Sequence, residues 1–225
     1  MLDVTVNTLT RGGEFLYATV SKIATIAPQY ILGVDSRIEQ KYIDVVNELK
    51  REFPHIEVIE YTIKDPFKDL VAARNDMLRC SKQQYVWIVD DDEVYPENQI
   101  ELLKTYISKD VGYAVQCFAI WNGVMAHKST SKLWIDRIFK NPKNLKWWGS
   151  FGKERLYNDE NVWMCSKRNY AIKRIPIKYI HFTHVKEATW RVELNKHRRA
   201  DGRKLIKLPE NIKEEVRRIY EKAYL

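Results

Sequence analysis

Four acidic residues in a row, Asp90 to Glu93, are the part of this sequence with the clearest capacity for chemistry. They follow directly on the hydrophobic run Tyr85-Val-Trp-Ile-Val89, which predicts a buried strand. In parallel α/β sheets, ligands bind at the carboxyl ends of the strands, where these carboxylates would lie. Two carboxylates about 5 Å apart repel by roughly 3 kcal/mol at an effective dielectric of about 20, and a divalent cation reverses that sign. We therefore predict a site for a hard cation, Mg²⁺ or Mn²⁺, at this strand end.

Asp90 and Asp92 are the two acids best placed to share one cation. In an extended segment alternate side chains point to the same side, so these two would present their oxygens together. The alternative is that an acid of this run caps a helix beginning near residue 97. A cap uses one aspartate and four acids occur here, so the sequence favours the metal site.

The elements that would position these acids alternate between strand and helix patterns over the first 110 residues. The expected strands cover 2–8, 30–34, 56–63, 85–89 and 111–121, and the expected helices cover 14–27, 38–53, 66–81 and 98–107. Strands joined by helices of this length form parallel βαβ units with right-handed crossovers. This order predicts a doubly wound α/β sheet.

The pattern changes to short strand-like segments after residue 125. These segments cover 133–139, 145–148, 162–165 and 177–182, and helices are expected at 187–199 and 210–224. No linker-like composition separates them from the first half, so we expect one domain over residues 1–225.

The overall composition is that of a globular protein. Of 225 residues, 45% are hydrophobic and only 8 are glycine, which excludes collagen-like and disordered chains. The longest uncharged stretch, 111–127, contains amides and glycines and is too polar to span lipid. The chain starts without a basic and apolar leader, and its three cysteines are widely spaced. We therefore expect a cytoplasmic protein with reduced thiols.

Positive charge is concentrated in the second half of the chain. Residues 1–110 hold 13 Lys and Arg against 19 Asp and Glu, whereas residues 111–225 hold 25 against 11. Six of the seven tryptophans also lie in the second half. One interpretation is a solvated basic surface, and the other is a surface for an anionic partner such as an acidic glycan, a phosphate-bearing lipid or a nucleic acid.

Two motifs together resemble those of the family-2 glycosyltransferases with the GT-A fold. They are the stretch Ala72-Ala-Arg-Asn75 on an expected helix and the Asp-X-Asp triplet that starts at Asp90. Looser matches include the start at Val4, the segment from Arg137 to Asn141 and the pair of histidines near residue 184. The resemblance implies a Rossmann-like, mostly parallel sheet with flanking helices, a β-rich acceptor side and C-terminal helices. It divides the chain into a nucleotide-sugar-binding half (1–110), an acceptor-side half (111–190) and a basic helical extension (191–225).

The resemblance implies a binding site for a nucleotide-sugar donor, with a UDP-sugar as the first candidate. Asp35, after the second strand, would contact the base or ribose of the nucleotide. Thr8 or Thr10, in the first strand-to-helix region, would lie beside it. Arg74 would lie near the diphosphate and stabilise its charge as the sugar leaves.

The resemblance also implies a metal ion, Mn²⁺ or Mg²⁺, that bridges the two phosphates. Asp90 would contact the ribose or the metal, and Asp91 is placed with it among the donor-binding residues. Asp92 would coordinate the metal. His184 is preferred to His181 as a further ligand, and the alternative is a histidine satisfied within the core.

An inverting enzyme needs a carboxylate base opposite the leaving group to take the proton of the acceptor hydroxyl. The family places this base in an acidic pair after the long strand, and the nearest match here is Glu154. Asp136 and Asp159 are the reserves. The alternative for Glu154 is a surface ion pair with Lys153 or Arg155.

Two classes of acceptor fit the basic half of the chain. The first is a glycan or a lipid-linked precursor, which would require only peripheral membrane contact because no transmembrane segment is expected. The second is a hydroxylated base in DNA, as in viral DNA-modifying glycosyltransferases, which would act in the host cytoplasm. Trp147, Trp148, Arg198 and Arg199 are the predicted acceptor-binding residues.

Two other functions remain as alternatives. A nucleotidyltransferase would use a similar sheet, but the match of Thr10-Arg-Gly-Gly13 to a phosphate-binding loop is short. A non-catalytic nucleic-acid-binding module would explain the basic half but not the acidic strand end.

Overall fold

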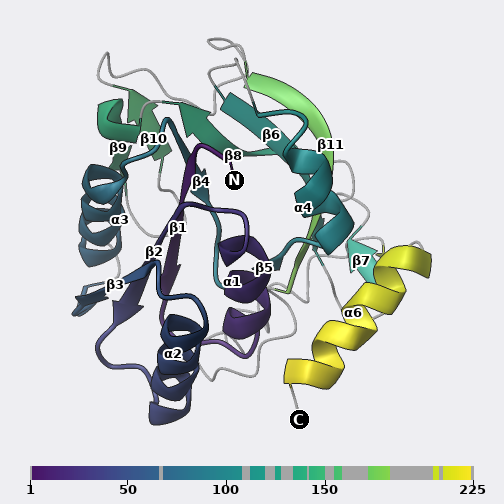
Figure 1. Cartoon of the computed structure of the whole chain (residues 1–225), viewed down its shortest axis with the longest axis horizontal. Coiled ribbons are helices and arrows are strands. Elements are labelled where there is room, and N and C mark those ends of the chain that lie inside the picture. The colour runs from purple at the N-terminus through teal and green to yellow at the C-terminus, as the bar shows by residue number, and fades with distance from the viewer. Residues whose placement is uncertain are drawn as a thin grey trace.

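Eight strands form the central sheet of the protein in the order β3-β2-β1-β4-β8-β6-β11-β5. The structure is a computed structural model that describes residues 2–65, 68–107, 112–119, 125–127, 134–140, 142–149, 155–158, 172–182, 205–207 and 210–223. Figure 1 shows the sheet with helices on both of its faces. The fold is therefore α/β, with a large mixed sheet at its centre.

The elements follow one another with few residues between them in the first half of the chain. That half contains β1 (Val4–Thr10), α1 (Leu16–Ala24), β2 (Gln29–Asp35), α2 (Gln40–Glu52), β3 (Ile56–Tyr61), α3 (Asp69–Cys80), β4 (Tyr85–Ile88), β5 (Glu93–Val94) and α4 (Glu97–Leu103). The second half contains β6 (Gly112–Ala119), β7 (Met125–His127), β8 (Trp134–Lys140), the 3₁₀ turn η2 (Pro142–Asn144), β9 (Leu145–Trp148), β10 (Arg155–Asn158), β11 (Ile172–His181), β12 (Leu205–Lys207) and α6 (Glu210–Ala223).

Six of the eight strands in the central sheet run in the same direction. β1 is parallel to β2 and β4, and β2 is parallel to β3. β8 runs antiparallel between β4 and β6, so β6 and its parallel neighbour β11 run in the direction of β4. β5 is antiparallel to β11. The sheet is thus mostly parallel, as the family resemblance implied, and the simpler expectation of a doubly wound sheet missed the two antiparallel strands.

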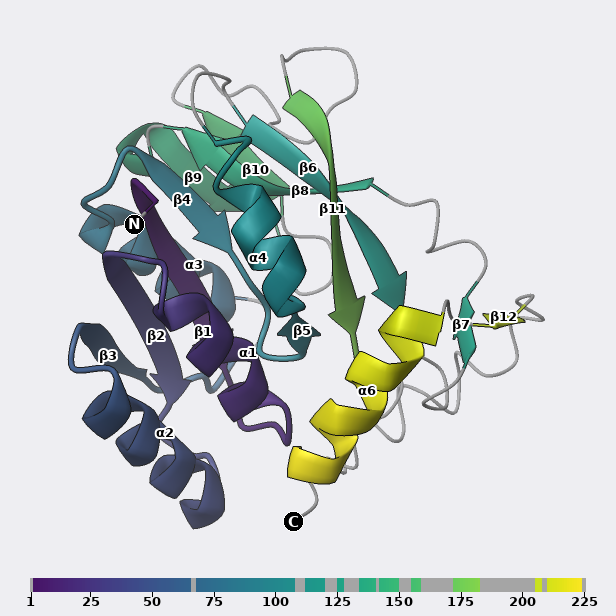
Figure 2. The ribbon, with the colours of Figure 1, turned by 45° about the vertical axis from the view of Figure 1, so that its right-hand side comes forward.

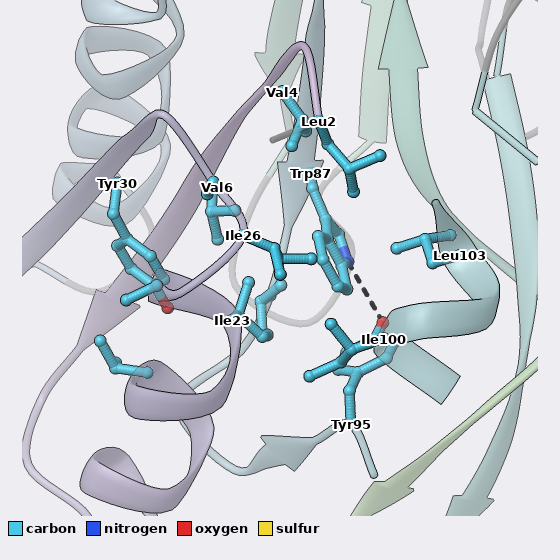
Figure 3. Packing of buried hydrophobic residues seen from close by; sticks show 14 of the residues in the cluster. Leu2, Val4, Val6, Ile23, Ile26, Tyr30, Trp87, Tyr95, Ile100 and Leu103 are labelled. Carbon is cyan, nitrogen blue, oxygen red and sulfur yellow. Dashed lines mark hydrogen bonds between the residues drawn. The ribbon is translucent and has the colours of Figure 1, made fainter. Parts of the chain in front are cut away.

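The core lies on both faces of β4, which is buried along its whole length. On one face, Trp87 packs with residues of β1 and α1, including Val4, Val6 and Ile23 (Figure 3). Its indole N–H donates a hydrogen bond of 3.3 Å to the hydroxyl of Tyr95. On the other face, β4 packs against α3 and the β9–β10 hairpin. A strand covered on both faces is hydrophobic throughout, which is why its position could be predicted from the sequence.

The C-terminal helix α6 packs beside the carboxyl end of β11 (Figure 2). Its hydrophobic face, formed by Ile212, Val216 and Ile219, lies against Phe15 and Phe182. The rings of Phe15 and Phe182 are stacked with their centroids 4.1 Å apart. Among the helices that the structure describes, none is both long enough and apolar enough to cross a bilayer.

Most predicted elements are present with bounds shifted by a few residues, and β11 is the main correction. It begins at Ile172 rather than at residue 177. Pro176 lies inside the strand, and the β11–β6 register shifts between Arg174 and Lys178, which accommodates a residue without an N–H group. The strands β5, β7, β10 and β12 were not predicted. The strand expected at 162–165 and the helix expected at 187–199 lie outside the described residues.

Candidate active site

The carboxyl ends of β1, β2, β4 and β11 lie at one edge of the sheet because these strands run in the same direction. Thr10 ends β1, Asp35 ends β2 and His181 ends β11, while the acidic run begins just beyond β4. The short strand β5 then brings the run to β11, where Glu93 is paired with His181. The fold therefore gathers polar residues from four strands.

The acidic run forms a turn and not the extended segment predicted from the sequence. The backbone N–H of Glu93 donates to the carbonyl of Asp90 at 3.0 Å, which closes a β-turn. The helix-cap alternative is also wrong. The next helix, α4, begins after Pro96, and no side chain caps it.

Asp90 is held by two arginines, one on each carboxylate oxygen. The Nη2 of Arg74, on α3, donates to Oδ1 at 3.1 Å, and the Nη2 of Arg137, on β8, donates to Oδ2 at 3.1 Å. Burial alone would raise the pKa of Asp90, but the positive charges of Arg137 and Arg74 hold it well below its usual value. The negative charge of Asp90 is therefore neutralised by the two arginines and does not by itself require a metal ion.

Glu93 is fully buried and shares Arg137 with Asp90. Its Oε2 also accepts a hydrogen bond of 3.3 Å from the backbone N–H of Asp90. Burial raises the pKa of Glu93 to about 7, against the opposing effect of Arg137. Two of the four acids are thus compensated by arginines, so the repulsion from which we predicted a cation is largely offset within the protein.

Asp92 faces His181 at the end of β11. The His181 Nε2 and the Asp92 Oδ2 are 3.4 Å apart. Burial alone would lower the pKa of His181, but the charge of Asp92 and hydrogen bonds to Asp92 and Cys117 raise it well above its usual value. The backbone carbonyl of Asp92 accepts a hydrogen bond of 2.9 Å from the N–H of Phe182, which fixes the turn to β11.

Asp91 lies on the α1 side of the site. Its Oδ2 accepts a hydrogen bond of 2.8 Å from the Thr10 hydroxyl, and its backbone carbonyl accepts one of 3.3 Å from the Thr19 hydroxyl. Thr8 is buried farther from the edge, 2.7 Å from the hydroxyl of Tyr30. Thr8, Thr10 and Asp91 are predicted donor-binding residues. In the structure Thr10 joins β1 to the acidic turn through Asp91, whereas Thr8 bonds to Tyr30 on β2.

Asp35 is buried between two arginines at the end of β2. The side chain of Arg37 donates to both carboxylate oxygens at 3.2 and 3.1 Å, and the Arg11 Nε lies 3.4 Å from Oδ2. The predicted nucleotide contact therefore lies in a basic environment that would attract an anionic ligand.

The pair Arg74 and Asn75 connects α3 to strand β9. The side-chain amide of Asn75 accepts from the Trp147 N–H at 2.7 Å and donates to the Trp147 carbonyl at 3.1 Å. The guanidinium of Arg74 lies over the Trp147 ring, 5.0 Å from its centroid. Arg74 and Trp147 border a small pocket, which is also lined by Asn7, Leu9, Met77 and Ile88. The neighbouring Trp148 is 65% exposed.

Asp92 and His181 provide two donors that fit a metal ion. No group of three or more His, Cys, Asp or Glu side chains that could hold a metal occurs in the described part of the chain. A carboxylate oxygen with an imidazole nitrogen suits Mn²⁺ better than Mg²⁺. Asp90 is less suited, because an arginine already occupies each of its oxygens. The described residues therefore supply two candidate ligands, so an ion bound here would need further ligands from outside this pair.

Several predicted residues lie outside the described residues. They are the candidate base Glu154, its reserve Asp159, the candidate metal ligand His184, and the acceptor-binding candidates Arg198 and Arg199. The other reserve, Asp136, precedes Arg137 on β8.

Three residues of the site were not assigned a role from the sequence. Arg137 was noted only within a loose family match, Asn75 only as part of a motif, and Glu93 only as one of four acids. The signal for Arg137 is the charged pair Asp136-Arg137 between the hydrophobic pairs Trp134-Ile135 and Ile138-Phe139, because an arginine buried in such a strand requires an acidic partner.

The comparison with solved structures finds TarS of S. aureus. The crystal structure of TarS 1-349 matches with a TM-score of 0.50 and 11% identity, covering 99% of this chain and 72% of that chain. The complex of TarS 1-349 with UDP-GlcNAc matches with a TM-score of 0.43 and 14% identity, covering 53% of this chain. In that match the chain spans 35% of the TarS fragment. No curated protein matches.

The comparison with protein families finds a family whose sequence model covers most of the sheet and the site. The model is described as glycosyl transferase family 2, and it matches residues 31–179, which is more than half of the chain. This range includes α3, the acidic turn, β8 and nearly all of β11. The chain therefore belongs to glycosyl transferase family 2, and its fold is the GT-A fold.

Proposed function

We propose that this glycosyltransferase moves a sugar from a nucleoside diphosphate sugar to an acceptor hydroxyl with the help of a divalent metal ion. The observation that carries the proposal is the pairing of Asp92 with His181 at 3.4 Å, beside the two arginines that hold Asp90. This arrangement offers metal ligands and fixed positive charge at the same edge of the sheet, as cleavage of a sugar diphosphate requires.

The donor nucleotide would bind at the ends of β1 and β2. Asp35 would meet the base or ribose, and Arg11 and Arg37 beside it would attract the negatively charged ligand. Asp90 is partly exposed, and each of its oxygens can accept a hydrogen bond in addition to that from its arginine. It would therefore act as an acceptor for the ribose rather than as a metal ligand.

Arg74 is the residue best placed to stabilise the leaving diphosphate. Its Nε is buried and has no hydrogen-bond partner among the described residues, so it retains a donor for an anionic ligand. Asp90 and the ring of Trp147 hold the guanidinium in place. A cation fixed before the reaction stabilises developing negative charge without reorganisation.

Asp92 and His181 would hold the metal ion. When bound, the ion would neutralise charge on the diphosphate as the bond to the sugar breaks. Because His181 has a raised pKa in the absence of metal, it would have to release a proton to become a ligand. Metal binding should therefore strengthen as pH rises.

In the transfer itself, the acceptor oxygen bonds to the anomeric carbon while the bond from that carbon to the phosphate oxygen breaks. The acceptor proton passes to a carboxylate base, and the nucleoside diphosphate leaves. We retain Glu154 as the candidate base of an inverting reaction, with Asp136 and Asp159 as reserves.

The exposure of Trp148 favours a carbohydrate as the acceptor. It is 65% exposed on the strand next to the pocket, and the Lys146 ammonium lies 5.6 Å from its ring centroid. An exposed indole is a platform on which a sugar ring can stack, and the lysine would favour a glycan or lipid-linked precursor that carries phosphate or carboxylate. A hydroxylated base in DNA is the competing acceptor, since indoles also stack on bases.

A donor-hydrolysis screen tests the proposal. UDP-, GDP- and dTDP-sugars are incubated with the protein and Mn²⁺, starting with UDP-GlcNAc because TarS has been crystallised with it. We expect metal-dependent hydrolysis of at least one donor, and its loss in Asp92→Asn. The matched control is Asp44→Asn on the exposed face of α2, which should retain the wild-type rate. Absence of hydrolysis and of nucleoside diphosphate binding would contradict the proposal.

A further inference from the structure

Arg137 occupies an irregular position in the central sheet. In the pairing of β6 with β8, Tyr113 lies opposite Ile138, but the next residue, Ala114, lies opposite Asp136. Arg137 is therefore the extra residue of a β-bulge. Bulges redirect side chains and are frequent beside active sites, so the position calls for a functional explanation.

The bulge lies where β4 ends and the acidic turn begins. On its other side, β8 pairs with β4 only as far as the contact of Ile138 with Trp87. Beyond this point the Arg137 side chain reaches the turn, where its Nη2 contacts Asp90 Oδ2 at 3.1 Å and also Glu93 Oε1. One guanidinium nitrogen thus joins the first and last residues of the turn.

The contacts of Arg137 complete a closed set of bonds around the turn. Asp90 and Glu93 are already joined by a hydrogen bond from the Glu93 N–H and by one to the Glu93 carboxylate. Arg74, on helix α3, donates a hydrogen bond to Oδ1 of Asp90, the oxygen that Arg137 does not contact. The carboxylate of Asp90 is therefore fixed from two sides, although 32% of its side chain remains exposed toward the edge of the sheet.

We infer that Arg137 is a positioning residue that orients the Asp90 carboxylate for the donor nucleotide, in addition to neutralising the buried Glu93. The inference rests on the proposed function, because it assigns Asp90 to donor binding. Neutralising Glu93 requires only a positive charge nearby, whereas orienting Asp90 requires a donor at the place of the Arg137 Nη2, within hydrogen-bond distance of Oδ2. The two roles can therefore be separated by mutation.

The test compares Arg137→Met with the double variant Arg137→Met/Glu93→Gln. The single variant leaves a buried carboxylate without its partner, and we expect its melting temperature to fall by roughly 10 °C. The double variant removes both charges, so the melting temperature should return to near the wild-type value. Titration calorimetry with UDP and MnCl₂ then measures donor-site affinity without knowledge of the acceptor. Arg218→Met, on the exposed face of α6, is the matched control.

If Arg137 orients Asp90, the double variant is stable but binds UDP about tenfold more weakly, which corresponds to one impaired hydrogen bond to a charged group. The KM for the donor in hydrolysis should rise by the same factor. If the double variant binds UDP like the wild type, Arg137 only balances Glu93, and the inference is overturned.

A second variant covers the case in which the double variant does not fold. Arg137→Lys keeps the charge, but its ammonium ends short of the place of the Arg137 Nη2, so the variant should fold and still bind UDP more weakly; wild-type affinity would overturn the inference. If the wild-type protein itself binds no nucleoside diphosphate, the proposed function fails. Crystal structures of the wild type and Arg137→Lys then decide the inference: a displaced Asp90 carboxylate supports it, and an unchanged one refutes it.

Discussion

The imidazole of His181, at the end of β11, lies 3.4 Å from the carboxylate of Asp92 in the turn after β4. The two residues meet because β5, directly after the turn, pairs with β11 and places Glu93 opposite His181. A basic nitrogen and a carboxylate oxygen from separate parts of the chain are thereby brought to one edge of the sheet.

His181→Ala should weaken the binding of Mn²⁺ at the proposed metal site. If the imidazole is a metal ligand, its loss should raise the Mn²⁺ concentration needed for half-maximal donor hydrolysis by at least about 10- to 100-fold, the range for replacing residues that only orient a metal ligand. Titration of Mn²⁺ at fixed donor concentration measures this. His55→Gln, at an exposed position, is the control. An unchanged Mn²⁺ requirement in His181→Ala would exclude this histidine from the metal site.

Asn75→Ala should destabilise the contact between α3 and β9. The Asn75 amide satisfies both the N–H and the carbonyl of Trp147, and its removal leaves two backbone groups without their partner. We expect the free energy of unfolding to fall by about 1–3 kcal/mol. Urea denaturation measures this value. Asn47→Ala, on the exposed face of α2, should change it by less than about 0.5 kcal/mol. Equal effects of the two substitutions would show that the Asn75 contact contributes nothing specific.

Ile219→Ala should reduce both stability and donor affinity. Ile219 is 3% exposed and belongs to the cluster of α6, Phe15 and Phe182. Truncation of a buried isoleucine lowers the free energy of unfolding by about 2–5 kcal/mol. Because Phe182 follows His181 and donates to Asp92, a loosened α6 should also weaken UDP binding in the presence of Mn²⁺. Arg217→Ala, on the exposed face of α6, should leave both quantities unchanged. Full UDP affinity in a destabilised Ile219→Ala would show that α6 does not support the site.

Trp148→Ala should impair transfer without affecting the donor site. The side chain is exposed, so stability and UDP affinity should stay at wild-type values. Loss of a stacking contact worth about 1–3 kcal/mol should raise the KM for the acceptor roughly 10-fold or more. The measurement is sugar transfer to an anionic glycan, a lipid-linked precursor and hydroxymethylated DNA. Transfer to the DNA alone, with binding lost steeply as salt increases, would select the DNA acceptor over the carbohydrate. An unchanged acceptor KM would exclude Trp148 from the acceptor site.

The sequence predicted the parts of the fold whose physical signals are local. The run from Tyr85 to Val89 is hydrophobic because β4 is covered on both faces, and β9 has the predicted bounds, Leu145–Trp148. The short strand β5, with two residues, has no periodicity from which it could be predicted. It exists because β11 provides a partner, which is a tertiary effect.

The site was predicted only in part for the same reason. The acidic run and Arg74 could be found because their residue types and spacing are unusual. The pairing of Asp91 with Thr10 and of Asp90 with Arg137 depends on a turn and a bulge, which the sequence does not reveal. Asp92 and His181 also come together only through the sheet order. The prediction of a cation from repulsion among the four acids was therefore too strong, because it did not include the arginines that pair with Asp90 and Glu93.

The measurement that tests the account most directly is a crystal structure with UDP and Mn²⁺, using anomalous scattering to locate the metal. If Asp92 and His181 hold the metal, a manganese peak lies between the carboxylate of Asp92 and the diphosphate, with His181 turned toward it. Bound UDP without a metal peak beside Asp92 would contradict the account.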